Sequence, residues 1–165
     1  MRAMFLIAAA ASLLAVAATA APGPGEIVIA QAAPFSGPLA PTGTHIRAGI
    51  QLYLDRVNAA GGVHGARLKL VSKDDGYKSE ETVRLVKELA REVKPVAFAG
   101  IVGTGNTEAL IKDGTLAEAS VPLVGARSGA TSLVKPVNPW IFQVRATYGE
   151  EVDKIVQQLS TIGFK

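Results

Sequence analysis

The chain has 165 residues, of which 48% are hydrophobic and 19% are charged, and its formal net charge is +3. The basic residues are scattered along the chain and form no stripe, which argues against nucleic acid as a partner. Cysteine is absent, so disulfide bonds are excluded and the stability of a single domain has to come from an apolar core.

The first twenty residues have the features of a secretory signal peptide. Arg2 precedes an uninterrupted apolar run, and the segment ends in Ala18-Thr19-Ala20, a small-x-small motif that signal peptidase accepts. We therefore predict cleavage after Ala20 and a flexible, Pro/Gly-rich leader over residues 21–25. A membrane anchor is the alternative, but the run is short for a span and lacks a basic flank.

Five apolar runs rich in branched residues follow, and stretches of helical periodicity separate them. Several runs are apolar on both faces, which is typical of strands buried between two layers of helices. This alternation predicts βαβ units and an α/β fold with a doubly wound parallel sheet of about five strands. The predicted strands are residues 26–33, 67–73, 95–102, 121–126 and 139–145.

The stretches between the runs have the apolar spacing and the end signals of helices. The first ends at Gly61-Gly62, the second opens at Ser79, and the third is expected to run from Asn106, as its N-cap, to Ala119. The first two stripes are Ile46, Ile50, Tyr53, Leu54 and Val57, and Val83, Val86, Leu89, Ala90 and Val93.

The last stretch differs because no apolar run follows it. Thr147 and Glu150 form a capping box, and the apolar stripe behind it ends at Gly163. The sequence stops at Lys165, where the pattern predicts another strand, so we expect an architecture that has been cut short. The stripe consists of Val152, Ile155, Val156, Leu159 and Ile162.

The motif GIVGTGNT, residues 100–107, joins an apolar run to a predicted helix, so its backbone N–H groups are placed to hold an anion. A dinucleotide fingerprint is disfavoured because Glu108 occupies the third glycine position and because the motif follows the third strand instead of the first. A P-loop is excluded because Gly-Lys-Ser/Thr is absent.

Patterns for catalysis and for metal binding are weak. The sequence GARSGA around Ser128 resembles a nucleophile elbow, but alanines occupy both glycine positions. His45 and His64 are expected at opposite ends of the sheet, so neither is placed beside Ser128. Asp74-Asp75 is more typical of a turn or a helix cap than of a metal site. We predict no catalytic residue, no metal ion and no cofactor.

A binding geometry remains. Ligands of open parallel sheets bind outside the carboxyl ends of the strands. The loops expected there are rich in glycine, serine and threonine, which favours a small anionic guest held by hydroxyl and N–H groups. The alternative is that these glycines serve turn geometry alone. The loops are residues 34–43, 74–79, 102–106 and 126–131.

Four motifs occur in a specific order: Ser36-Gly37-Pro38, Asn58-Ala59-Ala60-Gly61-Gly62, Asp74-Asp75 and RATYGEE. In this order, residues 26–165 resemble extracytoplasmic solute-binding proteins of ABC importers, of the type that includes branched-chain amino-acid receptors. The resemblance implies a periplasmic protein with two lobes that close on a solute. Residues 26–146 would form the first lobe, and residues 147–165 the first helix of a truncated second lobe.

The resemblance also implies a ligand, a partner and a site. The ligand would be a small solute with a carboxylate, such as an amino acid, an amide or an aromatic acid, and the partner would be an ABC permease. The loops after the third and fourth strands would hold the carboxylate, through the hydroxyls of Thr104 and Ser128 and the backbone N–H groups of Gly105 and Gly129.

Two more positions belong to the expected site. Thr42 stands where similar proteins often present an aromatic side chain, and Arg127 either adds a charged contact or points to solvent. The alternative functions are an extracytoplasmic sensor domain and a serine hydrolase that uses Ser128. Without a partner sheet, the helix face at 150–162 would favour self-association.

Overall fold

The computed structural model describes residues 25–164, so the predicted signal peptide and its cleavage site lie outside the described residues. None of the described helices is both long and apolar enough to cross a membrane. The elements are β1 (Glu26–Ala33), α1 (Ala40–Ala59), β2 (Arg67–Asp74), α2 (Ser79–Glu92), β3 (Ala97–Ala99), α3 (Thr104–Asp113), α4 (Thr115–Ala119), β4 (Leu123–Val124), the 3-10 turn η1 (Thr131–Leu133), β5 (Ile141–Phe142) and α5 (Tyr148–Thr161).

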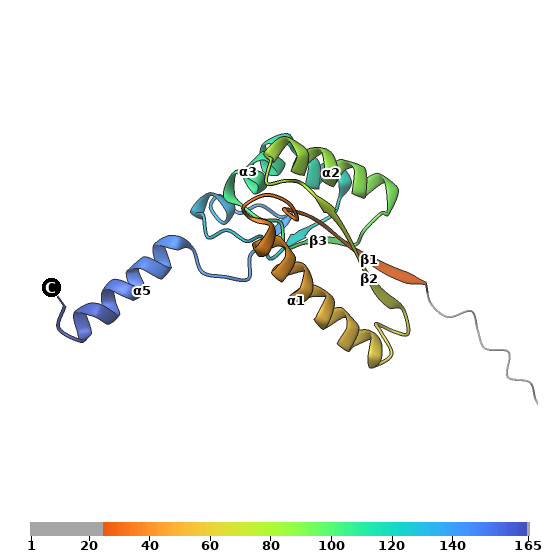
Figure 1. Cartoon of the computed structure of the whole chain (residues 1–165). Helices are drawn as coiled ribbons and strands as arrows, with labels where there is room; N and C mark the ends of the chain where they lie inside the picture. Colours follow the sequence, from red (N-terminus) through yellow and green to blue (C-terminus); the bar gives the residue numbers. More distant parts are fainter. Residues whose placement is uncertain (1–24, 165) are drawn as a thin grey trace, which may run out of the picture.

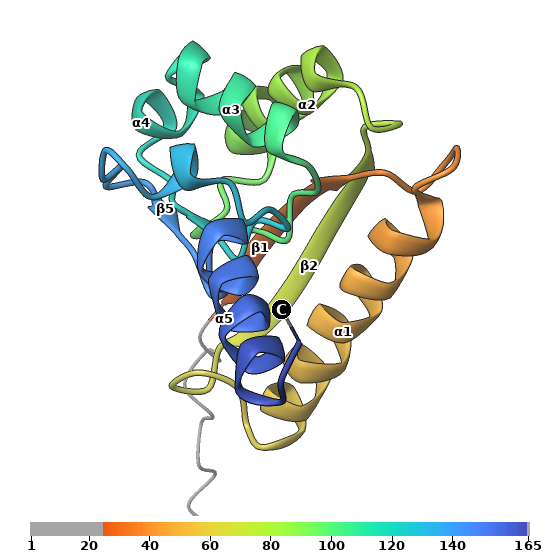
Figure 2. The same cartoon turned by 90° about the vertical axis from the view of Figure 1, so that its left-hand side faces the viewer.

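The predicted parallel α/β sheet is confirmed. Its five strands lie in the order β2-β1-β3-β4-β5, and every neighbouring pair is parallel. Helices α2, α3 and α4 cover one face and α1 lies on the other (Figure 2). The side chains at the centre of the core are fully buried and come from strands and helices alike, among them Val86, Leu89, Phe98, Leu110 and Leu123.

The three later strands are shorter than the apolar runs that predicted them. Gly100 follows β3 with φ 65° and Gly125 follows β4 with φ 64°. These left-handed conformations interrupt the extended backbone, so regular pairing stops there. Beyond them a single parallel bridge between Val102 and Arg127 keeps the two chain segments together.

The prediction for the third helix was wrong in two respects. The helix begins at Thr104 with Gly103 as its N-cap, and Gly114, at φ 77°, divides it into α3 and α4. Asn106 lies in the first turn of α3, and its side-chain amide donates a 2.7 Å hydrogen bond to Thr82 Oγ1. Asn106 is therefore committed to a tertiary contact and does not cap the helix.

The stripe predicted for the first helix is only partly buried. Leu54 is the one member of the stripe that is fully buried, and Tyr53 is 64% exposed. The side chain of Asn58 ties α1 to β2 through hydrogen bonds to both the carbonyl and the N–H of Leu68. Helix α1 thus packs mainly against β2.

Helix α5 starts at the predicted capping box, which is confirmed. Thr147 Oγ1 accepts the N–H of Glu150, and the Glu150 carboxylate accepts the N–H of Thr147. No residue of α5 is buried, and the helix extends away from the sheet (Figure 1). Its apolar stripe therefore faces solvent.

Candidate ligand-binding site

Two of the predicted site residues meet at the carboxyl end of the sheet. The Gly103 N–H donates to the Arg127 carbonyl over 3.3 Å, which draws the start of α3 to the loop after β4. Thr104 Oγ1 and Ser128 Oγ then lie 2.7 Å apart. Two hydroxyls that are 24 residues apart in sequence thus form one polar pair.

The start of α3 supplies N–H groups beside this pair. Gly103 has φ 105° and ψ 140°, a conformation that only glycine adopts readily. The first N–H groups of the helix, including that of Gly105, have no acceptor within the helix and carry its positive partial charge. Gly105 is exposed, so a guest can reach them.

The loop after β4 is held from two directions. Ser128 is fully buried, its Oγ accepts the Ala130 N–H over 3.2 Å, and its carbonyl accepts a 3.3 Å hydrogen bond from the Gln143 side chain. The Gly129 carbonyl accepts the Tyr148 N–H over 2.7 Å. These bonds fix the hydroxyl of Ser128 and the N–H of Gly129 toward the start of α5.

Tyr148 is a site residue that the sequence analysis missed. Its ring packs on Gly129, because a Cβ there would lie 2.8 Å from Tyr148 Cδ1. The pKa of the phenol is lowered, chiefly by the Gly129 N–H and further by the hydroxyls of Ser128 and Thr104. A partly negative oxygen is therefore favoured where these donors converge. The only sequence signal was the motif RATYGEE, in which Thr147 drew attention as a helix cap.

A second aromatic residue, Tyr77, was also missed. Its backbone has φ 62°, and its ring packs on Gly103, since a Cβ there would lie 2.8 Å from Tyr77 Cε2. The side chain is 46% exposed. An aromatic edge of the site is thus supplied by the loop after β2.

The other two predicted residues have different surroundings. Thr42 was expected in a loop but lies in the first turn of α1, because the helix already begins at Ala40, where Pro41 suits its start. Arg127 is exposed, and no carboxylate of residues 25–164 lies within 4.0 Å of its guanidinium group. The backbone of Arg127 is tied to the site through its pairing with Val102.

The hydrogen bonds of Ser128 give no sign of a catalytic nucleophile. Its Oγ pairs with Thr104 and Ala130, and neither His45 nor His64 is among its partners in the described part of the chain. Within residues 25–164, no group of three or more His, Cys, Asp or Glu side chains is arranged to hold a metal ion.

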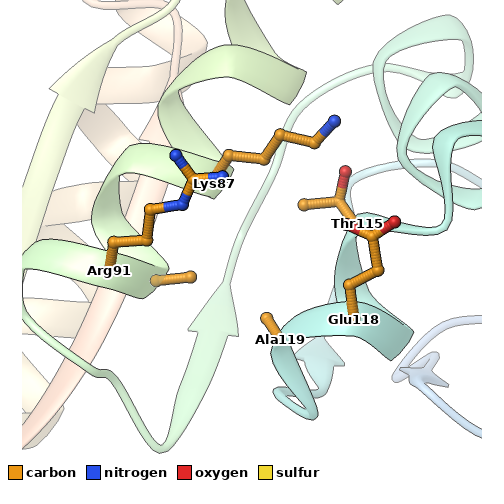
Figure 3. A pocket seen from close by; sticks show the side chains of 6 residues that line it. Lys87, Arg91, Thr115, Glu118 and Ala119 are labelled. Carbon is orange, nitrogen blue, oxygen red and sulfur yellow. The ribbon is translucent and has the colours of Figure 1, made fainter.

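The site reaches the surface at Gly105 and Arg127, which are exposed, whereas Ser128 is fully buried. Grooves on the molecule lie elsewhere, for example between α2 and α4, where Lys87, Arg91 and Glu118 line a shallow gap (Figure 3). In that gap the Lys87 ammonium is already paired with Asp113 over 2.6 Å.

A parallel α/β lobe with hydrogen-bond donors gathered at the carboxyl ends of its strands is the architecture of a ligand-binding domain. The chain belongs to the periplasmic binding protein family, whose model matches residues 26–165. The family groups solute-binding proteins, which act by binding and not by catalysis.

Individual relatives agree with this assignment. A curated "Leu/Ile/Val-binding protein homolog 7" of Brucella suis biovar 1 (strain 1330) is 35% identical over 95 residues, which are 58% of this chain and 23% of the relative. A crystal structure of a substrate-binding periplasmic protein from Ralstonia solanacearum is 45% identical, with a TM-score of 0.79 over 84% of this chain and 38% of that one.

A third relative was solved with a ligand. It is a branched-chain amino acid transporter substrate binding protein of Streptococcus pneumoniae in complex with isoleucine. It is 30% identical, with a TM-score of 0.68 over 74% of this chain and 34% of that one. The chain thus spans well under half of the length of each of these three relatives.

Proposed function

We propose that this chain is the substrate-binding component of an ABC importer and captures a small solute through its carboxylate. The observation that carries the proposal is that the hydroxyls of Thr104 and Ser128 lie 2.7 Å apart and that both, together with the Gly129 N–H, lie beside the phenol of Tyr148. The lowered pKa of Tyr148, to which these groups donate, supports the proposal, because the same hydrogen bonds favour a negatively charged oxygen. A carboxylate oxygen has the charge and the acceptor capacity that such donors select.

The proposed solutes are amino acids, amides and aromatic acids, because each presents a carboxylate or a similar acceptor next to a variable group. The aromatic edge formed by Tyr77 and Tyr148 would contact that variable group. Gly105 would add its N–H to the carboxylate, and the positive end of α3 would stabilise the charge without a buried cation.

The proposed capture needs a second lobe and a membrane partner. We propose that residues 26–146 are the first of two lobes, that residues 147–165 form the first helix of the second lobe, and that the closed protein docks on an ABC permease. The coverage of 38% of the Ralstonia structure supports this division. The signal peptide would direct export to the periplasm and would be cleaved after Ala20.

The test is a thermal-shift titration of the purified protein with L-isoleucine, L-leucine, L-glutamine and phenylacetate. A binder raises the unfolding free energy as its concentration grows, by about 2.7 kcal/mol at a hundred times the dissociation constant. Thr104→Val and Ser128→Ala should each raise the apparent dissociation constant from the titration by at least about fivefold, since each removes a hydrogen bond to a charged group.

Thr161→Val is the matched control, because it removes a threonine hydroxyl from the exposed end of α5 that bonds only to the Gln157 carbonyl. The proposed site would be refuted if Thr161→Val weakened the shift as much as Thr104→Val did. It would also be refuted if a solute without a carboxylate or amide shifted the protein equally well.

We further propose that the exposed stripe of α5 supports self-association. Val152, Ile155 and Val156 are each more than half exposed, and Phe142 at the sheet edge is 54% exposed. Apolar surface of this extent is favourably buried between copies of a protein.

A further inference from the structure

The carboxylate of Asp75 is buried and has no role in the site as described so far. It lies just after β2, is 1% exposed, and has no cationic side chain among its hydrogen-bond partners. Oδ1 accepts the Tyr77 N–H over 2.9 Å, and Oδ2 accepts the Thr82 hydroxyl over 2.7 Å. A buried carboxylate with neutral partners is costly, so its hydrogen bonds call for a physical explanation.

Each oxygen of Asp75 leads to a group that touches Gly103. The first arm runs through the Tyr77 N–H, which helps hold Tyr77 at φ 62° with its ring on Gly103. The second arm runs through Thr82 Oγ1, which accepts the Asn106 side-chain amide over 2.7 Å. The Oδ1 atom of that same amide lies 3.0 Å from the position that a Cβ of Gly103 would occupy.

Gly103 is the N-cap of α3, and its φ of 105° sets the direction in which the helix departs. Groups that confine Gly103 therefore also orient the N–H groups of Thr104 and Gly105. Thr82 and Asn106 are 0% and 3% exposed, so solvent cannot replace either of them in the second arm.

From this geometry we infer that Asp75 is a positioning residue: through Tyr77 on one side and Thr82–Asn106 on the other, it fixes the start of α3 in the orientation that binds the solute. The inference rests on the proposed function for its consequence in binding. The contacts that lead from Asp75 to Gly103 are themselves present in the unliganded protein.

Thr82 offers the sharpest test because valine has its shape without its hydroxyl. Thr82→Val leaves Asp75 Oδ2 and the Asn106 amide without their common partner, whereas Thr82→Ser keeps the hydroxyl. Asp75→Asn also keeps both arms, since its amide can donate to Thr82 while the Thr82 hydroxyl turns to the Lys78 carbonyl, which is 3.1 Å away. The measurement is amide hydrogen exchange of the purified protein by NMR, without ligand.

The diagnostic amide is Thr107, whose N–H donates to the Gly103 carbonyl over 3.2 Å, and the reference is Phe98 in β3, whose N–H donates to Pro122. In Thr82→Val we expect Thr107 to exchange about tenfold faster relative to Phe98, with shifted resonances for Thr104 and Gly105. Thr82→Ser and Asp75→Asn should each keep the wild-type ratio of the Thr107 and Phe98 exchange rates.

Val86→Ala controls for general destabilisation, because Val86 is fully buried in the same helix and lies outside the network. If Thr107 responded to Thr82→Val no more than to Val86→Ala, the positioning role of Asp75 would be overturned. The same conclusion would follow if Thr82→Ser and Asp75→Asn behaved like Thr82→Val.

A separate measurement on the same variants is the binding of L-isoleucine. Thr82→Val should weaken the affinity by at least about fivefold although Thr104 and Ser128 are intact, and Val86→Ala should not. Unchanged affinity in Thr82→Val would refute the consequence for binding and leave the proposed function standing. If the wild-type protein bound none of the probes, the proposed function would fail, and the exchange ratio would still decide whether Asp75 positions α3.

Discussion

Asp74 and Asp75 are adjacent in sequence, yet their surroundings act on them in opposite directions. The pKa of Asp74 is lowered from 3.8, chiefly by the Ser36 hydroxyl and further by the N–H groups of Phe35 and Gly76. The pKa of Asp75 is raised from 3.8, chiefly because burial penalises its charged form. The two residues therefore have different roles. Asp74 caps a turn at the surface, and Asp75 positions the start of α3 through Tyr77 and Thr82.

The two carboxyl groups should give opposite pH dependences of stability. Asp74 binds its proton less tightly when folded, so its contribution is present above pH 3.8 and is lost as the pH falls toward its lower folded pKa. Asp75 binds its proton more tightly when folded, so its contribution declines as the pH rises from 3.8 through its higher folded pKa.

Relative to wild type, Asp74→Asn should therefore lose stability as the pH rises from about 3 to about 7, and Asp75→Asn should gain stability over the same range. Urea unfolding followed by the fluorescence of Trp140 measures both differences. Two variants whose differences run parallel with pH would contradict this assignment.

At the scale of elements, two glycines in α1 have opposite roles. A Cβ on Gly43 would lie 1.9 Å from the Pro34 carbonyl oxygen, so the first turn of the helix packs directly on the chain that leaves β1. A Cβ on Gly49, two turns later, would meet nothing within 4 Å. One glycine permits close packing of helix and strand, and the other only weakens the helix.

Gly43→Ala should therefore destabilise the protein by about 2 kcal/mol or more, because the obstructing atom is backbone and cannot rotate away. Gly49→Ala should leave stability unchanged or raise it by up to about 1 kcal/mol, since alanine is the better helix former. Equilibrium denaturant unfolding of both variants measures the contrast. Equal effects would mean that α1 does not pack on Pro34 as described.

At the scale of the whole molecule, the described chain consists of a well-packed sheet with its helices and a last helix that has no buried residue. The site lies where these two parts meet, because Tyr148 is the first residue of α5 and packs on Gly129 at the carboxyl edge of the sheet.

We expect the protein to associate with itself through the stripe of α5, and Ile155→Lys should shift the equilibrium toward the monomer. Gln157→Lys places the same charge off the stripe and should have little effect. Sedimentation velocity over a range of protein concentrations distinguishes the two variants. A wild-type protein that stays monomeric at all concentrations would refute self-association through this face.

The sequence by itself determined the class of fold and the loops that form the carboxyl edge of the sheet. The runs that are apolar on both faces and the helical stripes between them specify a parallel sheet, because burial of apolar side chains follows the period of each element. Chain order and parallel topology place the loops 102–106 and 126–131 together at the carboxyl edge, and the resemblance to solute-binding proteins selects Thr104, Gly105, Ser128 and Gly129 within them.

The tertiary structure alone decided which side chains meet at that edge. The sequence predicts Asn106 as a helix cap, but its amide donates to Thr82, 24 residues away, and Gly103 occupies the cap position. Tyr77 and Tyr148 belong to no periodic apolar pattern. Each contacts the site at one glycine, Gly103 or Gly129, whose missing side chain leaves room for the ring. Contacts of this kind depend on the packing of segments remote in sequence, and local propensity and hydrophobic spacing carry no information about them.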